Sequence, residues 1–247
     1  MCQTYSGTVH QTIDNFLTIA QIAIDDALNN PRVLAALERQ GYTRDRIRSG
    51  KTLYENALTA HRWRKAVHND QMRTAAALNQ AWKISQKSHR QLVKAARLRF
   101  KSDLGVTTRL NLNSRGKRSL SSQLLHAQQL YTNLLNSPEL MDALQPSGIT
   151  PAKLKIAQAE IEIVQTAHLV NAKEKLTAQA AAKARNAAIN TLRAWLSDFI
   201  HIARIALRKN PELLESTVFA TLPDSPFEWN RYQFMGEKVR QLESVRK

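Results

Sequence analysis

Apolar residues recur every three or four positions along most of the chain, a period that predicts amphipathic helices. Two such segments, Thr12 to Asn29 and Ser119 to Asn136, are followed by Pro31 and Pro138, which suit the first turn of a short helix. Ser137 is a suitable N-cap for the second of these short helices. Strand patterns are nearly absent, so the sequence predicts an all-α protein.

Glycine and threonine residues mark where these short helices end and where the next helices begin. Gly41 and Gly148 suit a left-handed C-cap, because glycine adopts that conformation without a steric cost. Thr43 and Thr150 suit the N-cap of the following helix, and Pro151 suits its first turn. The same punctuation therefore occurs twice in the chain.

Each of these following helices is predicted to be unusually long. Beyond Thr43 and Pro151, about 58 residues contain no proline and, apart from Gly50, no glycine, so one helix would span about 87 Å. The alternatives are a coiled-coil-like long helix and a helical hairpin that breaks at a polar stretch such as 68–71 or 175–178. No turn signal marks a break, so the sequence favours the long helix.

The chain aligns with itself without gaps when position 16 is paired with position 123 and every later position is shifted equally. About twenty of the 89 pairs between 16–104 and 123–211 are identical, and they include the repeated triplet Thr-Ala-His that ends at His61 and His168. Helical composition alone does not put proline and glycine at matching positions. We therefore expect two tandem copies of one helical unit, consisting of a helix, a short Pro-started helix and a long helix or hairpin, with bundle-like or coiled-coil-like packing.

This duplication predicts the domain organisation. The first helical unit covers residues 1–106, and the second covers 123–218. Residues 107–122 are polar, basic and poor in helix formers, so we expect a linker there. Residues 219–247 depart from the repeat and suit a strap across the bundle or a docking segment for a partner. That tail contains four closely spaced aromatic residues, Phe227, Trp229, Tyr232 and Phe234.

Polar residues are predicted on the inward faces of both long helices. An apolar stripe leads to His61 in the first copy and to His168 in the second, so both histidines are expected to face the core. Eighteen residues make five turns, which puts Asn79 and Asn186 on the same faces. We expect these four residues to fix helix register; the alternatives are anion contacts, or a metal or haem between the histidines.

The net charge of +16 creates a field that favours an acidic protein or a polyanion as partner, although a solvated basic surface is the simpler alternative. Basic residues are densest from 62 to 101, where eleven lysines and arginines accompany one acid, with Trp63, Trp82 and Phe100 interleaved. Their directions around a helix vary. The expected partner contacts are Arg62, Arg64, Lys65, Lys87, Arg90, Lys94, Arg97 and Arg204.

No catalytic constellation is visible in the sequence. There is no phosphate-cradling glycine loop, no nucleophile elbow and no metal-ligand cluster, so we expect no enzymatic activity, no cofactor and no metal. The single cysteine, Cys2, favours a reducing, cytoplasmic setting. No run of 18 apolar residues predicts a membrane-spanning helix.

Two stretches carry a resemblance to a known group of proteins. Trp195 to Leu207, with Asn210 and Pro211 after it, and the element from Ser137 to Thr150 resemble blocks in bacterial helical proteins of unassigned function. The resemblance implies a tandem helical fold and an intracellular location, and it implies no activity. Residues 61–65 are also faintly similar to the histidine-containing helical domain that binds polyphosphate.

These observations lead us to expect a non-enzymatic helical binding or scaffolding protein that forms a homo-oligomer or joins an assembly. A basic protein that binds nucleic acid or polyphosphate is the first alternative. A haem- or metal-binding helical bundle is the second.

Overall fold

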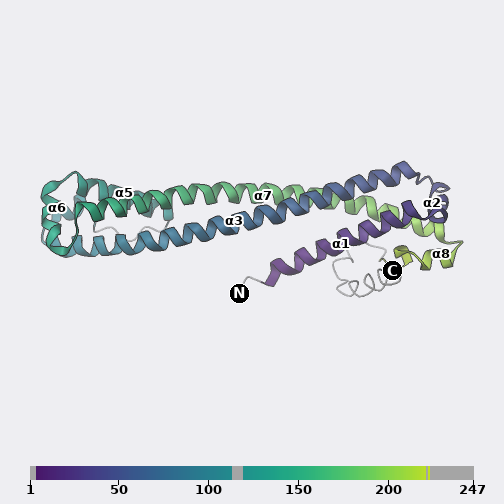
Figure 1. Cartoon of the computed structure of the whole chain (residues 1–247), viewed down its shortest axis with the longest axis horizontal. Coiled ribbons are helices and arrows are strands. Elements are labelled where there is room, and N and C mark those ends of the chain that lie inside the picture. The colour runs from purple at the N-terminus through teal and green to yellow at the C-terminus, as the bar shows by residue number, and fades with distance from the viewer. Residues whose placement is uncertain (1–3, 113–118, 221, 223–247) are drawn as a thin grey trace. The chain divides into compact units, whose positions relative to one another are not determined.

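Helices make up all the regular structure that the computed structural model describes, in residues 4–112, 119–220 and 222 (Figure 1). The first half contains α1 (Thr4–Asn29), α2 (Pro31–Glu38), α3 (Arg44–Arg99) and α4 (Leu104–Arg109). The second half contains α5 (Leu120–Leu135), α6 (Pro138–Leu144), α7 (Pro151–Leu207) and α8 (Pro211–Glu215). Two single 3-10 turns are η1 (Gln145–Ser147) and η2 (Val218–Ala220). The expected all-α class is confirmed.

Both long helices are continuous. Helix α3 has 56 residues and α7 has 57, so the hairpin alternative is wrong and the long helix is confirmed. The Oγ1 atom of Thr43 accepts the N–H of Arg46 at 3.4 Å, which begins α3 as the sequence predicts. Thr150 caps α7 in the same way, 3.3 Å from the N–H of Lys153.

Local turns follow the predicted glycine and proline positions. Gly41 and Gly148 adopt φ values of 79° and 73°, the left-handed conformation that ends a helix. Pro31 and Pro138 are the first residues of α2 and α6. The expected N-cap at Ser137 differs, because its side chain makes no capping bond.

The Ser137 hydroxyl instead accepts a hydrogen bond from Nη2 of Arg109 at 2.6 Å. That arginine ends α4, which overlaps the start of the segment 107–122 that the sequence predicts as a linker. The Asp103 side chain begins α4 by accepting the N–H of Val106 at 2.9 Å, and Leu110 and Leu112 are buried directly after it. The first part of the segment is therefore packed structure, because a side-chain cap and two core leucines outweigh its polar composition.

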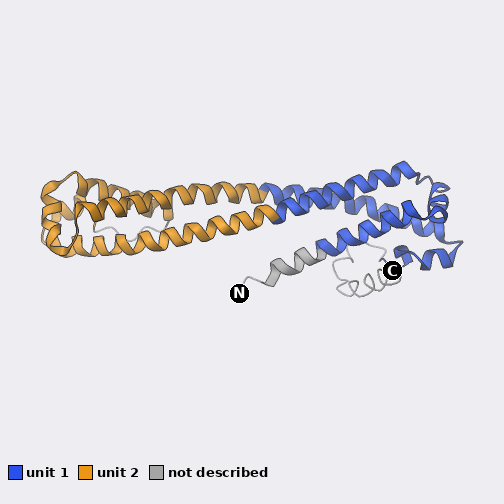
Figure 2. Cartoon of the chain, viewed as in Figure 1, with its two compact units in different colours: residues 1–65, 180–247 blue, residues 66–179 orange. Residues whose placement is uncertain are grey.

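The chain forms two compact units, each of which takes part of α3 and part of α7 (Figure 2). Unit 1 contains residues 1–65 and 180–247, and unit 2 contains residues 66–179. Neither unit coincides with one of the two sequence copies. The predicted boundaries of the two sequence copies, at residues 106 and 123, stay a prediction.

The core of unit 1 is built around aromatic residues. Phe199 on α7 is fully buried, stacks on Trp195 with ring centres 4.8 Å apart, and contacts Tyr42 and Phe219 edge-on or tilted. Alanines and leucines of α1 and α2 complete this core, so the amphipathic faces that the sequence predicts are buried. Of the aromatic tail, Phe227 to Phe234 lie outside the described residues.

The core of unit 2 joins α3, α5, α6 and the start of α7. Its largest buried side chain is Tyr131 on α5, surrounded by leucines from all four helices. The inward residues of α3 here follow the alternate three- and four-residue spacing of a coiled-coil seam. They are Leu78, Trp82, Ser85, His89, Leu92 and Ala96.

This seam corrects the prediction for two polar residues. Asn79 in α3 and Asn186 in α7 are exposed, not inward. A seam with a period of about 3.5 residues completes five turns in roughly 17 residues, whereas the predicted spacing of eighteen assumes a straight helix. Asn79 is therefore one residue away from the seam position Leu78, and Asn186 is one residue away from the half-buried Arg185.

Candidate anion-binding site

Six basic residues of unit 2 lie in one row along α3 and the turn after it. Their spacing is four, three, four, three and four residues, which confines them to an arc of about 80° around the helix. All six are exposed. The row consists of Lys83, Lys87, Arg90, Lys94, Arg97 and Lys101.

The sequence reading that basic side chains scatter around α3 therefore misses this alignment. Four of the predicted partner contacts, at positions 87, 90, 94 and 97, belong to the basic row. The remaining basic residues of the stretch, such as Arg62 and Arg73, are also exposed but lie outside this unbroken series. The row is the longest series of cations spaced three or four residues apart in the basic stretch.

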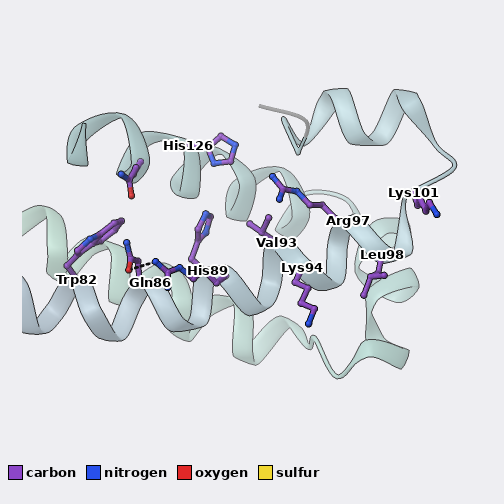
Figure 3. A pocket seen from close by; sticks show the side chains of 11 residues that line it. Trp82, Gln86, His89, Val93, Lys94, Arg97, Leu98, Lys101 and His126 are labelled. Atoms are coloured by element: carbon purple, nitrogen blue, oxygen red, sulfur yellow. Dashed lines mark hydrogen bonds between the residues drawn. The ribbon is translucent and has the colours of Figure 1, made fainter. Parts of the chain in front are cut away.

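A pocket of about 760 Å³ lies between the basic row and α5 (Figure 3). This volume is in the range of about 300–1,000 Å³ that is typical of ligand sites. The residues that line the pocket include four cations and no carboxylate. They are Trp82, Gln86, His89, Arg90, Val93, Lys94, Arg97, Leu98, Lys101, Gln123 and His126.

No carboxylate neutralises the basic row within the part of the chain that the structure describes. Arg90 donates from Nη2 to the side-chain oxygen of Gln86 at 2.9 Å, and Arg97 donates from Nε to the carbonyl of Leu112 at 3.0 Å. Both acceptors are neutral. The facing helix α5 contains no charged residue, so the field of the row extends across the pocket.

Two histidines and a tyrosine form a polar cluster beside the cations. Nδ1 of His89 lies 3.1 Å from the Tyr131 hydroxyl, and Nε2 of His126 lies 3.0 Å from the carbonyl of Asn111. The two imidazole rings meet edge to face at 6.1 Å. Burial, with smaller effects from His126 and Arg97, lowers the pKa of His89 to about 4. This histidine is therefore neutral near pH 7.

When the chain is aligned with itself, each residue of this polar cluster is paired with an apolar residue of the other copy. His89, His126 and Tyr131 correspond to Leu196, Ile19 and Ile24, which are all buried in the core of unit 1. Positions 83, 87, 90 and 94 of the basic row correspond to an asparagine, an alanine, a serine and a histidine. Helices of this design therefore pack without these cations and without the polar cluster.

His61 is part of a different polar cluster, in unit 1. Its ring is 1% exposed, and Nε2 lies 2.8 Å from the carboxylate of Asp14, which also accepts from Lys65 at 2.8 and 3.0 Å. Partial burial alone would raise the pKa of Asp14, but hydrogen bonds from Lys65 and His61 hold this pKa below its usual value. The cluster joins α3 to α1, and its carboxylate already accepts from both Lys65 and His61. Burial lowers the pKa of His61 even though the Asp14 carboxylate opposes this shift.

The other predicted contacts in unit 1 also have structural roles or no partner. Arg204 donates from Nε to the carbonyl of Phe219 at 3.0 Å and from Nη2 to the carbonyl of Leu222, so it holds the chain after α8 in place. Arg64 is half-buried, with Nε and Nη1 shielded from solvent and no hydrogen-bond partner among the described residues. Burial, and the nearby charge of Arg64, lower the pKa of Arg185.

His168 lies in unit 2, where its Nε2 atom is 3.5 Å from the hydroxyl of Ser121. His61 and His168 thus have separate partners in separate units. No group of three or more histidine, cysteine, aspartate or glutamate side chains suited to a metal ion occurs in residues 4–112, 119–220 or 222. The metal or haem alternative stays a prediction.

Sequence reasoning did not identify His89, His126 and Tyr131 as site residues. They come from α3 and α5, and only the folded chain brings them together. The available signal was the alignment of the chain with itself, in which polar residues replace Leu196, Ile19 and Ile24.

Comparison of the chain with protein-family models, with curated proteins and with solved structures found no match. The resemblance to bacterial helical proteins of unassigned function stays a prediction. Among the described helices, none combines the length and the apolar content that a membrane crossing requires.

Proposed function

We propose that the chain is a non-enzymatic helical protein that binds a polyanion through the basic row and the pocket of unit 2. The observation that carries this proposal is the alignment of six cations beside a pocket whose lining contains no carboxylate. Four of these cations line the pocket directly. A ligand with regularly spaced negative charges would match this arrangement.

Electrostatics supports a ligand of opposite charge. Neighbouring members of the row are three or four residues apart, about 5 Å along the helix axis. Each such pair of like charges costs up to about 1 kcal/mol in water, and less where the long side chains diverge. An anion bound along the row removes this repulsion and gains several attractive contacts.

We also propose that the chain arose as a tandem duplication, which makes unit 1 an internal reference for unit 2. Matching hydrogen bonds support it, because the pair Arg97 and Leu112 and the pair Arg204 and Phe219 occupy equivalent positions. The contacts of His61 with Asp14 and of His168 with Ser121 have the same relation. Positions 83, 87, 90 and 94 are basic in one copy and are paired with an asparagine, an alanine, a serine and a histidine in the other. Folding of the helix therefore does not require these cations, which supports a role for them in binding.

The test is binding of a fluorescent polyanion at several salt concentrations. The ligands are a 20-nucleotide single-stranded DNA and a polyphosphate chain. We expect at least one of them to bind, with an affinity that falls steeply as salt increases. The double variant Lys87→Gln with Lys94→Gln should weaken binding about tenfold or more at low salt.

The matched control removes two exposed lysines of unit 1, with Lys51→Gln and Lys183→Gln. It changes the net charge by the same amount and should weaken binding much less. If both double variants lose affinity equally, binding depends on net charge alone and the basic row is not a site. If neither ligand binds at low salt, the proposed function is wrong.

Self-association is a second candidate function, supported by an apolar stripe on α7. Ile156, Ile163 and Val170 are 62%, 59% and 45% exposed and are seven residues apart, which is the spacing of a coiled-coil contact. A second copy of the chain presents the same stripe, and the two stripes can cover each other symmetrically.

Light scattering measures this association directly. We expect the wild-type protein to form a dimer or larger assembly and Ile163→Lys to form a monomer. Leu104→Lys is the control, since Leu104 is 74% exposed and lies in α4, away from the stripe. A wild-type monomer at high concentration would contradict the proposal.

A further inference from the structure

We infer that the polyanion is a single-stranded nucleic acid, with one unpaired base held in the pocket against Trp82 and the neighbouring phosphates on the basic row. This inference rests on the proposed function and adds the identity of the ligand. It is carried by the position of an aromatic ring and neutral polar groups beside the cations.

Trp82 gives the pocket a flat aromatic surface. It is half-buried in the seam of α3, and it lines the pocket at the end where the row begins (Figure 3). Val93 and Leu98 add apolar surface farther along the same helix. A phosphate polymer without bases has no flat group that stacks on this surface, whereas every nucleobase has a face that stacks on an aromatic ring.

The neutral polar groups of the pocket suit the edge of a base. Gln86 on α3 and Gln123 on α5 carry amides that both donate and accept hydrogen bonds, and both residues line the pocket. His89 is neutral near pH 7 and adds an imidazole between Gln86 and Val93 (Figure 3). Such groups recognise donors and acceptors on an uncharged heterocycle, while phosphate needs only donors and cations.

The recessed position of these groups favours an unpaired base over a duplex. They lie between two helices of unit 2, whereas the six cations of the row are all exposed at the surface. In a double helix, the bases are stacked and paired inside the phosphate backbones, and an aromatic side chain that lines a pocket between two helices does not reach their faces. A single strand can turn one base into the pocket and keep its phosphates outside.

The equivalent positions in unit 1 provide a matched contrast. Trp82 and Gln123 correspond to Ile189 and Phe16, both buried. Gln86 corresponds to Arg193, whose guanidinium lies 5.4 Å from the centre of the Phe16 ring. In unit 1, the guanidinium of Arg193 and the ring of Phe16 therefore occupy the positions at which unit 2 has the amides of Gln86 and Gln123.

The experiment compares four ligands at one salt concentration: a 20-nucleotide oligothymidylate, an abasic strand of equal length, a duplex of equal length, and polyphosphate. We expect the oligothymidylate to bind at least tenfold more tightly than the abasic strand, which has the same backbone charges. One stacked base accounts for roughly 5- to 150-fold in affinity. The duplex and polyphosphate should bind no better than the abasic strand.

The variant Trp82→Ile isolates the stacking contribution. Isoleucine is the residue at the equivalent position 189, so the fold accommodates it. We expect this variant to bind the oligothymidylate about as weakly as the abasic strand and to leave abasic binding unchanged. Trp82→Phe should retain part of the preference. Trp63→Leu, a change at a 44% exposed tryptophan of unit 1, is the control and should have no effect.

Two outcomes would overturn the inference while the proposed function stands. The first is equal affinity for the abasic and thymidylate strands, or tighter binding of the duplex or polyphosphate. The second is an equal loss for every ligand in a folded Trp82→Ile variant. If no ligand binds, the proposed function itself fails, and this inference fails with it.

Discussion

Nδ1 of His89 lies 3.1 Å from the hydroxyl of Tyr131, which ties the pocket side of α3 to a tyrosine that is fully buried in α5. Burial raises the pKa of that tyrosine and lowers the pKa of His89 to about 4. Both groups therefore remain neutral near pH 7. The folded state of unit 2 thus favours an uncharged imidazole at this position.

We predict that unit 2 loses stability in mildly acidic solution. An unfolded histidine has a pKa of about 6.5, so between pH 6.5 and 4 the unfolded chain binds a proton at His89 that the folded chain does not bind. Stability from this group is complete above pH 6.5 and decreases as pH falls, by about 2 kcal/mol at pH 5. Urea denaturation at pH 7.5, 6 and 5 measures the decrease.

His89→Leu is the matched variant, because a leucine occupies the equivalent position 196. The variant should be less stable at pH 7.5 by about 1–3 kcal/mol, since the Tyr131 hydroxyl loses its partner. Its stability should change less between pH 7.5 and 5 than that of the wild type. His201→Gln, at an exposed histidine, should keep the wild-type dependence, and an unchanged dependence in His89→Leu would contradict the assignment.

The helices were predictable from the sequence because their signals are local. Pro31, Gly41 and Thr43 each act through the backbone of a few neighbouring residues, and continuity of α3 follows from the lack of breakers. The pocket was not predictable in this way. His89 and His126 are brought together by packing of α3 on α5, and a single sequence does not specify which helical faces meet.

We predict that Gly50→Ala destabilises unit 1. A Cβ atom at this position would overlap the indole of Trp195, which is itself held by stacking on Phe199. Overpacking of this kind costs about 1–3 kcal/mol, which exceeds the gain of up to about 1 kcal/mol from replacing glycine inside a helix. Thermal denaturation measures the difference.

Gly105→Ala in α4 is the matched control for that substitution. The added methyl would meet only the Asp103 carboxylate at 3.4 Å, a contact that needs little adjustment. This variant should therefore be as stable as the wild type or slightly more stable. Equal melting temperatures for the Gly50 and Gly105 variants would show that the Trp195 indole moves aside without cost.

We predict that Asp14→Ala destabilises unit 1 by about 1–2 kcal/mol at pH 7, because the buried ring of His61 loses its 2.8 Å hydrogen bond to this carboxylate. Lys65→Ala should cost less than about 1 kcal/mol, since both members of that ion pair are about half exposed. Neither variant should change polyanion binding, because this cluster lies outside unit 2. Urea denaturation and the binding assay together check this expectation.

Arg97 has two roles that substitution can separate, because it belongs to the basic row and also donates to the carbonyl of Leu112. Arg97→Lys keeps the charge and removes the Nε donor, so stability should fall by about 1 kcal/mol while the salt dependence of binding stays unchanged.

Lys94→Gln should do the reverse, because this lysine is exposed and makes no ion pair among the described residues. Its stability should match or slightly exceed that of the wild type, because two like-charge pairs of the row are removed. The slope of log affinity against log salt should become shallower by about 0.7 to 1. Arg204→Lys, at the position equivalent to Arg97, should lower stability alone. The basic row would not hold the phosphate contacts if the slope became shallower in Arg204→Lys, or if it stayed unchanged in Lys94→Gln.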